Sequence, residues 1–464
     1  MSSQPAKRRV SRREFLARTA IAGAGAGIWA SSGTSVWGAA TARPKVAAVV
    51  TEFTYRSHAH VILENFLKPY LFNGQLTDPG AEVISLYIDQ FPEGEMGRSV
   101  SQEYKLPIFG TIDEALCLGG KELAVDAVLS IGEHGNYPHN EKGQHEYPRK
   151  RFFDEIVKTF KRTGKTAPVF NDKHLSYRWD WAKEMYDTSR EMGFALMAGS
   201  SVPLAQRTPP LEVAVGTPFV EAVSIHGGGV ESYDFHCLEV LQSLVEFRTG
   251  GESGVSEVQF LEGAELWKAA EAGRWSVPLA EAAMKAEYDR ETPGTTLPPL
   301  KQLVKELKGD ENSLHGILLK YNDGFRAAAI TVGSSSTRWN FAGRVKNQTE
   351  PVATSFYVGP WQNRNLFKAL SHAIQTHFRE KKAPYPVERT LLVTGILDAE
   401  MQSRYEKGTV QQTPQLKIAY QPLDFRAMRE MGASWKIINE QTPEPMGINP
   451  NGGAVKCVDE SLET

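Results

Sequence analysis

The sequence predicts an α/β protein in which a doubly wound parallel sheet is followed by an α+β domain with an open, mostly antiparallel sheet. The chain has 464 residues, more than one compact domain usually contains. As far as Ser200, short apolar runs alternate with helix-like segments, which is typical of parallel strands joined by crossover helices. After Ser200, strand candidates follow one another with turn signals between them, which favours antiparallel pairing.

Two of the strand candidates before Ser200, residues 45–50 and 125–131, are largely apolar runs, as expected of strands that are buried on both faces. All the predicted strands of this half cover residues 45–50, 82–89, 125–131, 168–170 and 194–197. The predicted helices cover residues 61–67, 112–118, 151–162 and 179–192. Right-handed crossovers between such strands give a Rossmann-like domain, which we place at residues 43–200.

The second half of the chain supports the α+β domain, with helices expected on one face of its sheet. Asn322-Asp323-Gly324 lies between two strand candidates and predicts a hairpin, because these residues tolerate positive φ. The predicted strands cover residues 220–226, 255–261, 316–321, 325–332 and 355–358. The predicted helices cover residues 237–248, 278–289, 301–308, 365–380 and 388–407. We place this domain, including both C-terminal helices, at residues 201–424, and an extended tail at 425–464.

Composition and charge exclude several classes of protein. With 41% hydrophobic and 23% charged residues, the chain is neither disordered nor a polytopic membrane protein. After position 42 it holds 46 basic and 54 acidic residues, so it lacks the positive footprint that nucleic-acid binding needs. Its three cysteines are far apart and build neither a disulfide framework nor a CxxC-type zinc site.

Residues 1–42 have the pattern of an export signal. Arg12 and Arg13 precede a small, weakly apolar stretch, and Ala40-Thr41-Ala42 offers a cleavage site after Ala42. The arginine pair resembles a twin-arginine signal. This resemblance implies that the twin-arginine machinery exports the folded protein, so we expect it in the periplasm or otherwise outside the cytoplasm.

Four segments of the mature chain, in this order and spacing, carry a resemblance to a known family. They are His58-Ala59, Val125–Val128, the run from Pro168 to Lys173, and the run from Ile396 to Gly408. With them, residues 45–410 resemble the Gfo/Idh/MocA oxidoreductases. The resemblance implies oxidation or reduction of a sugar, polyol or related carbohydrate with NAD or NADP. It also implies a homo-oligomer formed through the second sheet.

The expected cofactor site departs from the family pattern. The first turn, residues 51–57, contains no glycine, although glycines normally let the backbone approach a pyrophosphate there. In compensation, Arg56 could pair with a phosphate. Asp89 falls where an acidic residue accepts hydrogen bonds from the ribose hydroxyls. Alternatively, Asp89 is a turn or helix-capping residue. Together with Glu133, these two residues are the candidate cofactor-binding residues.

The resemblance assigns catalytic roles to Lys173 and His236. Lys173 would lie beside the reacting carbon and stabilise a developing alkoxide, and His236 would act as the general base. The family often places a carboxylate one turn before this histidine, where this chain has Ser232. Glu231 or Asp234 could substitute, and we include Asp234 among the candidate substrate-binding residues.

Polar residues after the third predicted strand allow a further set of interpretations. His134, Tyr137 and His139 suit hydrogen bonds to a carbohydrate. Alternatively, histidines at the carboxyl edge of the sheet suit a divalent metal and a metal-dependent carbohydrate lyase, isomerase or hydrolase. The candidate metal ligands are His58, His60, His134 and His174. A third possibility is a non-catalytic sugar-binding protein that has lost dinucleotide binding.

Overall fold

The computed structural model describes residues 42–448, and from Arg43 onward these residues form one compact unit. The export signal predicted at residues 1–42 and the last part of the predicted tail, residues 449–464, lie outside this range except for Ala42. Within the described range, no helix is long and apolar enough to cross a membrane.

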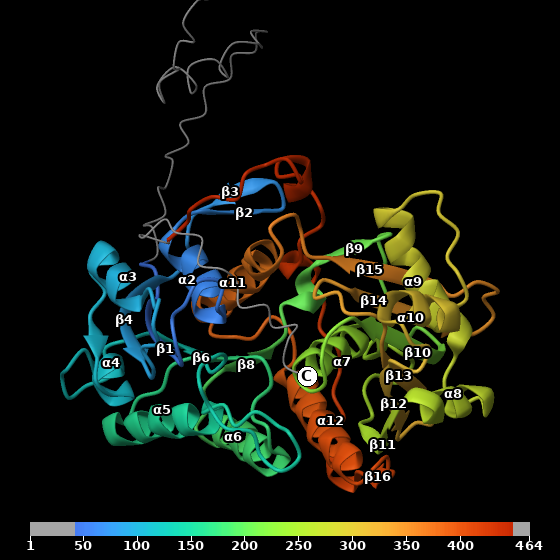
Figure 1. Cartoon of the computed structure of the whole chain (residues 1–464). Helices are drawn as coiled ribbons and strands as arrows, with labels where there is room; N and C mark the ends of the chain where they lie inside the picture. Colours follow the sequence, from blue (N-terminus) through green and yellow to red (C-terminus); the bar gives the residue numbers. More distant parts are fainter. Residues whose placement is uncertain (1–41, 449–464) are drawn as a thin grey trace, which may run out of the picture. The chain divides into compact units, whose positions relative to one another are not determined.

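The first half of the chain forms a six-stranded parallel sheet in the order β5-β4-β1-β6-β7-β8 (Figure 1). Its strands are β1 (Lys45–Val50), β4 (Glu82–Ile88), β5 (Ile108–Phe109), β6 (Ala127–Ile131), β7 (Val169–Asp172) and β8 (Leu196–Gly199). A small hairpin, β2 (Tyr70–Phe72) and β3 (Gln75–Thr77), follows the first helix. The helices are α2 (His58–Leu67), α3 (Gly97–Tyr104), α4 (Ile112–Cys117), α5 (Arg149–Thr163) and α6 (Trp179–Glu191). The predicted doubly wound parallel sheet is confirmed.

The two faces of this sheet bury alternate residues of each strand, because successive side chains of a strand point to opposite sides. In β1, Val46, Ala48 and Val50 belong to one buried core, whereas Ala47 and Val49 belong to another. The first core lies under α2 and the second under α4, α5 and α6. All of these β1 residues are 0% exposed, which explains why the strand reads as one unbroken apolar run.

The second half forms an eight-stranded sheet in the order β16-β11-β12-β13-β10-β14-β15-β9. Its strands are β9 (Gln206–Thr208), β10 (Phe219–His226), β11 (Val255–Glu262), β12 (His315–Tyr321), β13 (Arg326–Thr331), β14 (Trp339–Val345), β15 (Val352–Tyr357) and β16 (Gln411–Gln412). Its neighbouring strands pair antiparallel except for β10 and β13, which pair parallel. The mostly antiparallel sheet is therefore confirmed, as is the hairpin between β12 and β13.

Helices cover both faces of this second sheet, so the expectation of helices on one face was wrong. One face packs against α7 (Ser232–Val245) and α12 (Val387–Tyr405), and the other against α8 (Gly263–Glu271), α9 (Val277–Glu291) and α10 (Leu300–Lys308). Side chains on both faces of the sheet are buried, and β13 shows this clearly. Its residues 327 and 329 belong to one core, and residues 328 and 330 belong to the other. A homo-oligomer formed through this sheet remains a prediction.

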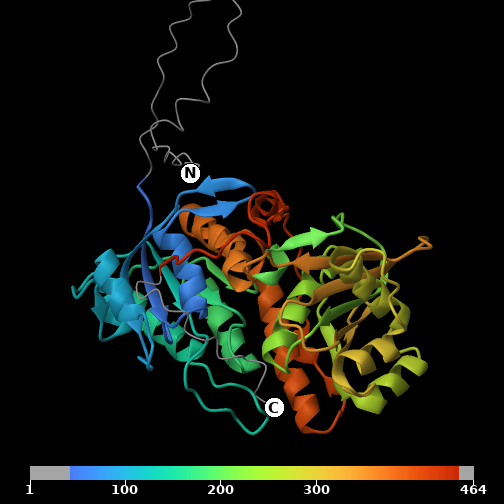
Figure 2. The ribbon, with the colours of Figure 1, turned by 45° about the horizontal axis from the view of Figure 1, so that its top comes forward.

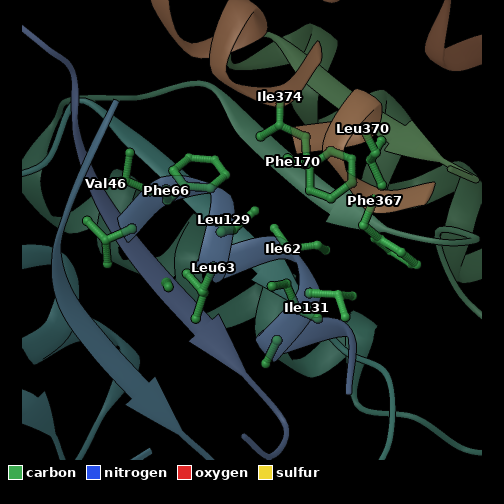
Figure 3. Close-up of a cluster of buried hydrophobic side chains, with 14 of the residues drawn as sticks. Val46, Ile62, Leu63, Phe66, Leu129, Ile131, Phe170, Phe367, Leu370 and Ile374 are labelled. Atoms are coloured by element: carbon green, nitrogen blue, oxygen red, sulfur yellow. The ribbon is translucent and has the colours of Figure 1, made fainter. Parts of the chain in front are cut away.

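The helix α11 (Asn363–Glu380) packs on the first sheet, although its sequence follows the strands of the second. Phe367, Leu370 and Ile374 of α11 share a core with α2 and with Phe170 of β7 (Figure 3). Figure 2 shows α11 beside α2, with the last described residues near the hairpin of β2 and β3. Of the two C-terminal helices that we place with the second sheet, α11 therefore packs elsewhere, because its apolar face completes the core of the first sheet.

The core between α11 and the first sheet holds a histidine that predicts a pH-dependent stability. His377 is 0% exposed, its Nε2 lies 3.3 Å from the carbonyl oxygen of Val169, and burial lowers its pKa to about 4. The unfolded chain therefore binds a proton at this residue near pH 6.5, whereas the folded chain binds it only near pH 4. As the pH falls through this window, the folded state loses about 3 kcal/mol through His377 alone.

We expect His377→Gln to abolish this loss, because glutamine keeps an N–H donor but does not titrate. Urea unfolding of both proteins at pH 7 and pH 4 measures the difference. Equal pH dependence of the free energy of unfolding in the two proteins would show that His377 is not buried as a neutral ring.

Candidate functional site

The candidate site is built around Lys173, the residue that directly follows β7. Its backbone lies in the left-handed region at φ 61°, and its side chain is 5% exposed. The Nζ atom lies 2.5 Å from Oε1 of Glu133, which follows β6, and 3.1 Å from Oγ of Ser232 at the start of α7. The carboxyl edge of the first sheet and the amino end of α7 therefore meet at this ammonium group.

Glu133 is held in its ionised form by two cations. Besides Lys173, Nη2 of Arg149 pairs with its second carboxylate oxygen. Burial alone would raise the pKa of Glu133, but the charges of Lys173 and Arg149 hold it well below its usual value. Arg149 is itself 0% exposed and also contacts Nε2 of His174 at 3.2 Å. This ion pair fixes the position of Lys173.

His236 lies one helical turn after Ser232, so both residues are on the same side of α7. Its Nδ1 lies 2.6 Å from Oγ of Ser200, which leaves Nε2 as the ring nitrogen that can exchange a proton with a ligand. Burial lowers the pKa of His236 well below its usual value, and the charge of Lys173 lowers it further. The imidazole is therefore neutral at pH 7 and able to accept a proton.

A second histidine is oriented by a carboxylate at the same edge. Nδ1 of His58, the first residue of α2, lies 2.6 Å from Oδ2 of Asp172 at the end of β7. Asp172 is 1% and His58 9% exposed. The ring of Phe367 contacts the His58 ring at 4.5 Å between centroids, so apolar packing also fixes its position.

The sequence indicates Glu231 only as a substitute for the carboxylate that the family often places one turn before its histidine. In the structure, Glu231 directly precedes Ser232 at the start of α7. Its Oε2 accepts a hydrogen bond from the amide of His145 at 2.9 Å. Burial raises the pKa of Glu231 to about 7, although Arg149 and Lys173 oppose that shift. A buried carboxyl group that titrates near neutral pH suits acid–base chemistry.

The loop after β6 folds back over the end of β4 instead of leaving a free ribose site there. Oδ2 of Asp89 accepts hydrogen bonds from Tyr137 Oη and from Arg151 Nη2, both at 2.6 Å, and its Oδ1 accepts one from Tyr87 Oη at 2.6 Å. Gln90, the next residue, exchanges hydrogen bonds with the backbone of Asn136. Side chains of the protein therefore already use the carboxylate that was expected to bind a ribose.

The pyrophosphate position of a Rossmann-like sheet is also altered. It would lie at the amino end of α2, but Oγ of Ser57 accepts from the amide of His60 there, and Nδ1 of His134 lies 3.5 Å from the amide of His58. The guanidinium of Arg56 is paired with Glu444 of the C-terminal segment at 2.5 Å. Phe53 fills the glycine-free turn and is 0% exposed. In this arrangement the residues do not fit a dinucleotide bound in the usual way.

The structure does not bring two other predicted sets of residues into the site. Asp234 lies two residues after Ser232, hence on another side of α7, and its carboxylate faces His226 and His315. His139 is exposed, and its ring contacts that of His145 at 4.2 Å.

The predicted histidine edge does not assemble as a metal site. Its members were His58, His60, His134 and His174. Across residues 42–448, only His226, Asp234 and His315 form a group of three or more such side chains whose ligand atoms all lie within 4.8 Å of one another. His60 lies two residues after His58 on α2, so the two side chains point to different sides of the helix. Nδ1 of His60 accepts a hydrogen bond from the Arg56 amide instead.

The chain combines a Rossmann-like parallel sheet with a second, mostly antiparallel sheet, and an ionic and histidine cluster lies where the edge of the first sheet meets α7. No protein-family model and no curated protein matches the sequence. Among solved structures, the chain is similar to GenD2 from gentamicin A biosynthesis in complex with NAD, at 11% identity and a TM-score of 0.50, over 81% of this chain and 98% of GenD2.

Two further similar structures are also dehydrogenases. The probable dehydrogenase from Thermotoga maritima has 11% identity and a TM-score of 0.49, over 80% of this chain and 99% of that one. The myo-inositol dehydrogenase from Lactobacillus casei, in complex with NAD(H) and myo-inositol, has 11% identity and a TM-score of 0.48, over 80% and 97%. These neighbours are of Gfo/Idh/MocA type, and at this identity the likeness concerns the fold.

Proposed function

We propose that the chain is an enzyme that carries out acid–base chemistry at a hydroxyl- or carbonyl-bearing carbon of a sugar, polyol or related carbohydrate. The observation that carries this proposal is the ammonium group of Lys173 at 3.1 Å from Oγ of Ser232, with the neutral imidazole of His236 one turn further along the same side of α7. An acid–base pair of this kind moves a proton and stabilises the oxygen charge that develops as the proton leaves.

In the proposed reaction, Nε2 of His236 accepts a proton from the substrate, and Nζ of Lys173 stabilises the oxyanion that remains. Glu133 holds Lys173 in place, because its carboxylate lies 2.5 Å from Nζ. Return of the proton to a different atom of the substrate would isomerise it, and loss of a neighbouring hydroxyl as water would make the enzyme a lyase. Glu231, with a pKa of about 7, is a second group that could deliver the proton.

A carbohydrate suits the residues around this pair. The loop after β6 brings His134, Tyr137 and His145 to the edge of the site, and Tyr147 stacks on His145 with 3.9 Å between ring centroids. Hydroxyl groups of a cyclic polyol find hydrogen-bonding partners among such side chains, and the aromatic rings offer apolar faces to the ring carbons.

A second candidate is oxidation or reduction of the same substrate with NAD or NADP. Its support is the fold shared with GenD2, which is named as a complex with NAD, and the presence of Lys173 and His236 at the positions that the family resemblance implies. The pairing of Asp89 with Tyr137 and Arg151 speaks against it. Export by the twin-arginine machinery and homo-oligomer formation remain part of the proposal.

We expect the full-length protein to exchange a carbon-bound hydrogen of a keto sugar or keto polyol for deuterium in D₂O without added dinucleotide. Proton NMR over a panel of such compounds measures the exchange, and calorimetric titration with NAD, NADH, NADP and NADPH measures cofactor binding. His236→Asn should lose the exchange. His372→Asn, which changes a histidine that contacts Tyr70 and Phe72, serves as the matched control.

The outcomes separate the candidates. Exchange without dinucleotide binding supports the acid–base enzyme. Saturable dinucleotide binding with turnover only in its presence supports the oxidoreductase instead. Carbohydrate binding with neither exchange nor turnover would contradict both and would leave a sugar-binding protein.

A further inference from the structure

A second cluster of titratable side chains lies in the second sheet and plays no part in the proposed reaction. His226 is the last residue of β10 and His315 the first residue of β12. The Nε2 atoms of both histidines lie 2.9 Å from the same carboxylate oxygen, Oδ1 of Asp234. The other oxygen, Oδ2, accepts a hydrogen bond from the amide of Glu231 at 2.8 Å, which orients the carboxylate. All three residues are buried, with His226 and Asp234 at 0% and His315 at 9% exposed.

Glu400 of α12 is a second buried acidic side chain near this cluster. It is 0% exposed, and burial together with the charge of Asp234 raises its pKa well above the usual value, so it is a neutral carboxyl group. Its oxygens are not among the ligand atoms that lie within 4.8 Å of one another, which in the described chain belong to His226, Asp234 and His315. The cluster therefore consists of two histidines and one carboxylate.

No lysine or arginine among residues 42–448 forms an ion pair with either acidic side chain. The ion pairs of Asp234 are those with His226 and His315, and Glu400 has none. Two imidazole nitrogens and one carboxylate from three separate elements therefore face one small volume, and no lysine or arginine of the described chain pairs with that carboxylate. A divalent cation is the group that binds this donor set and cancels this charge.

We propose that His226, His315 and Asp234 bind one divalent transition-metal ion, with Zn²⁺ as the best match. The residues differ from the histidine edge that the sequence suggested, and the site does not depend on the proposed reaction. Two histidines and one carboxylate are a known zinc ligand set, and Oγ1 of Thr331 or a water molecule would take the fourth position.

The distances require only a small adjustment. Bonds of about 2.0–2.2 Å at tetrahedral angles place ligand atoms about 3.3–3.6 Å apart, slightly farther than the 2.9 Å between Asp234 Oδ1 and the two nitrogens. Binding through Nε2 would move the proton of His226 to Nδ1, so the 3.3 Å contact from the Gly228 amide would be lost. Thr331 Oγ1 lies 3.0 Å from His226 Nε2 and 2.7 Å from His315 Nε2, and offers a further oxygen.

The ion would hold together parts of the chain that are distant in sequence. It would join the ends of β10 and β12 to the first turn of α7. The same first turn of α7 carries Ser232, which contacts Lys173. Zinc binding in this cluster would therefore stabilise the second sheet and fix the helix that borders the candidate site.

Metal analysis of the full-length protein, purified without chelator, tests the proposal. Inductively coupled plasma mass spectrometry should find about one zinc ion per chain. Removal with a chelator should lower the melting temperature by several degrees, and ZnCl₂ should restore it. X-ray absorption of the unaltered protein should show only nitrogen and oxygen ligands, with the scattering pattern of imidazole.

Variants locate the site. His315→Gln and His226→Gln should each lose the metal and the response to ZnCl₂, whereas His377→Gln, which changes another buried histidine, should keep both. Absence of zinc and of any thermal shift with ZnCl₂, Mn²⁺ or Fe²⁺ in the unaltered protein would overturn the proposal. Retention of the metal in folded His315→Gln would overturn it as well. If these variants do not fold, the chelator experiment and the absorption spectrum of the unaltered protein still decide.

Discussion

Replacing Lys173 by methionine should lower kcat about 10²–10⁴-fold on any carbohydrate that the unaltered protein converts. Methionine approximates the length of the lysine chain but cannot donate to a developing oxyanion. Glu133 would keep its pairing with Arg149, so the carboxylate would not be left without a cation. We therefore expect the loss to appear mainly in kcat and less in KM, because the interaction with Lys173 is strongest when charge develops on the substrate oxygen.

Steady-state kinetics with the substrate found in the NMR panel measures this effect. Lys183→Met is the matched control, since Lys183 pairs with Asp187 on the exposed side of α6 and both side chains are 45% exposed. A kcat of Lys173→Met within about twofold of the unaltered enzyme would show that Lys173 is a structural residue, because removing a group that stabilises charge costs far more.

Replacing Arg389 by methionine should lower the free energy of unfolding by about 3–5 kcal/mol. Arg389 of α12 pairs with Glu246 at the C-terminus of α7 through two contacts, Nη2 to Oε1 at 2.5 Å and Nε to Oε2 at 2.9 Å. Arg389 is 1% and Glu246 0% exposed. Without the guanidinium, the buried carboxylate of Glu246 retains a hydrogen bond from Tyr420 Oη but no cation.

Urea unfolding followed by circular dichroism measures this loss. The double variant Arg389→Met with Glu246→Met should recover most of the stability, because replacing both partners of a buried ion pair by apolar residues is often nearly neutral. Arg404→Met, at an exposed position of α12, should change stability by less than about 0.5 kcal/mol. A loss below about 1 kcal/mol for Arg389→Met would mean that water reaches the pair, as at a surface salt bridge.

The strands and most helices could be predicted because each of them has a local signature. The run from Val46 to Val50 is apolar throughout because both faces of the sheet are covered, and the Asn322-Asp323-Gly324 turn fixes the hairpin of β12 and β13. The placement of α11 has no such signature. The apolar stripe of α11, with Phe367 and Leu370, could pack against either sheet. Only the tertiary structure shows that it packs against the first.

The candidate site also has a part that the sequence predicts and a part that only the structure shows. Lys173 was predicted at a strand end and His236 on a helix. The structure places Nζ of Lys173 against Oγ of Ser232, and His236 lies one turn after Ser232 on the same helix. The contacts of Asp89 and Asp234 depend on partners far away in sequence, Tyr137 for the first and His315 for the second. No spacing rule relates residues so far apart in the sequence. The sequence therefore could not show that side chains of the protein bind the Asp89 carboxylate, or that Asp234 belongs to the histidine cluster of the second sheet.

The position of α11 has a consequence for how the protein is made. Ribosomes add about 5–20 residues per second, so α11 emerges about 10–40 s after β8, the last strand of the first sheet, has been synthesised. During that time the surface formed by Leu129, Phe170 and Met197 lacks its covering helix. The amino-terminal sheet can therefore complete its core only after nearly the whole chain has left the ribosome, and until then this surface is a natural binding site for chaperones.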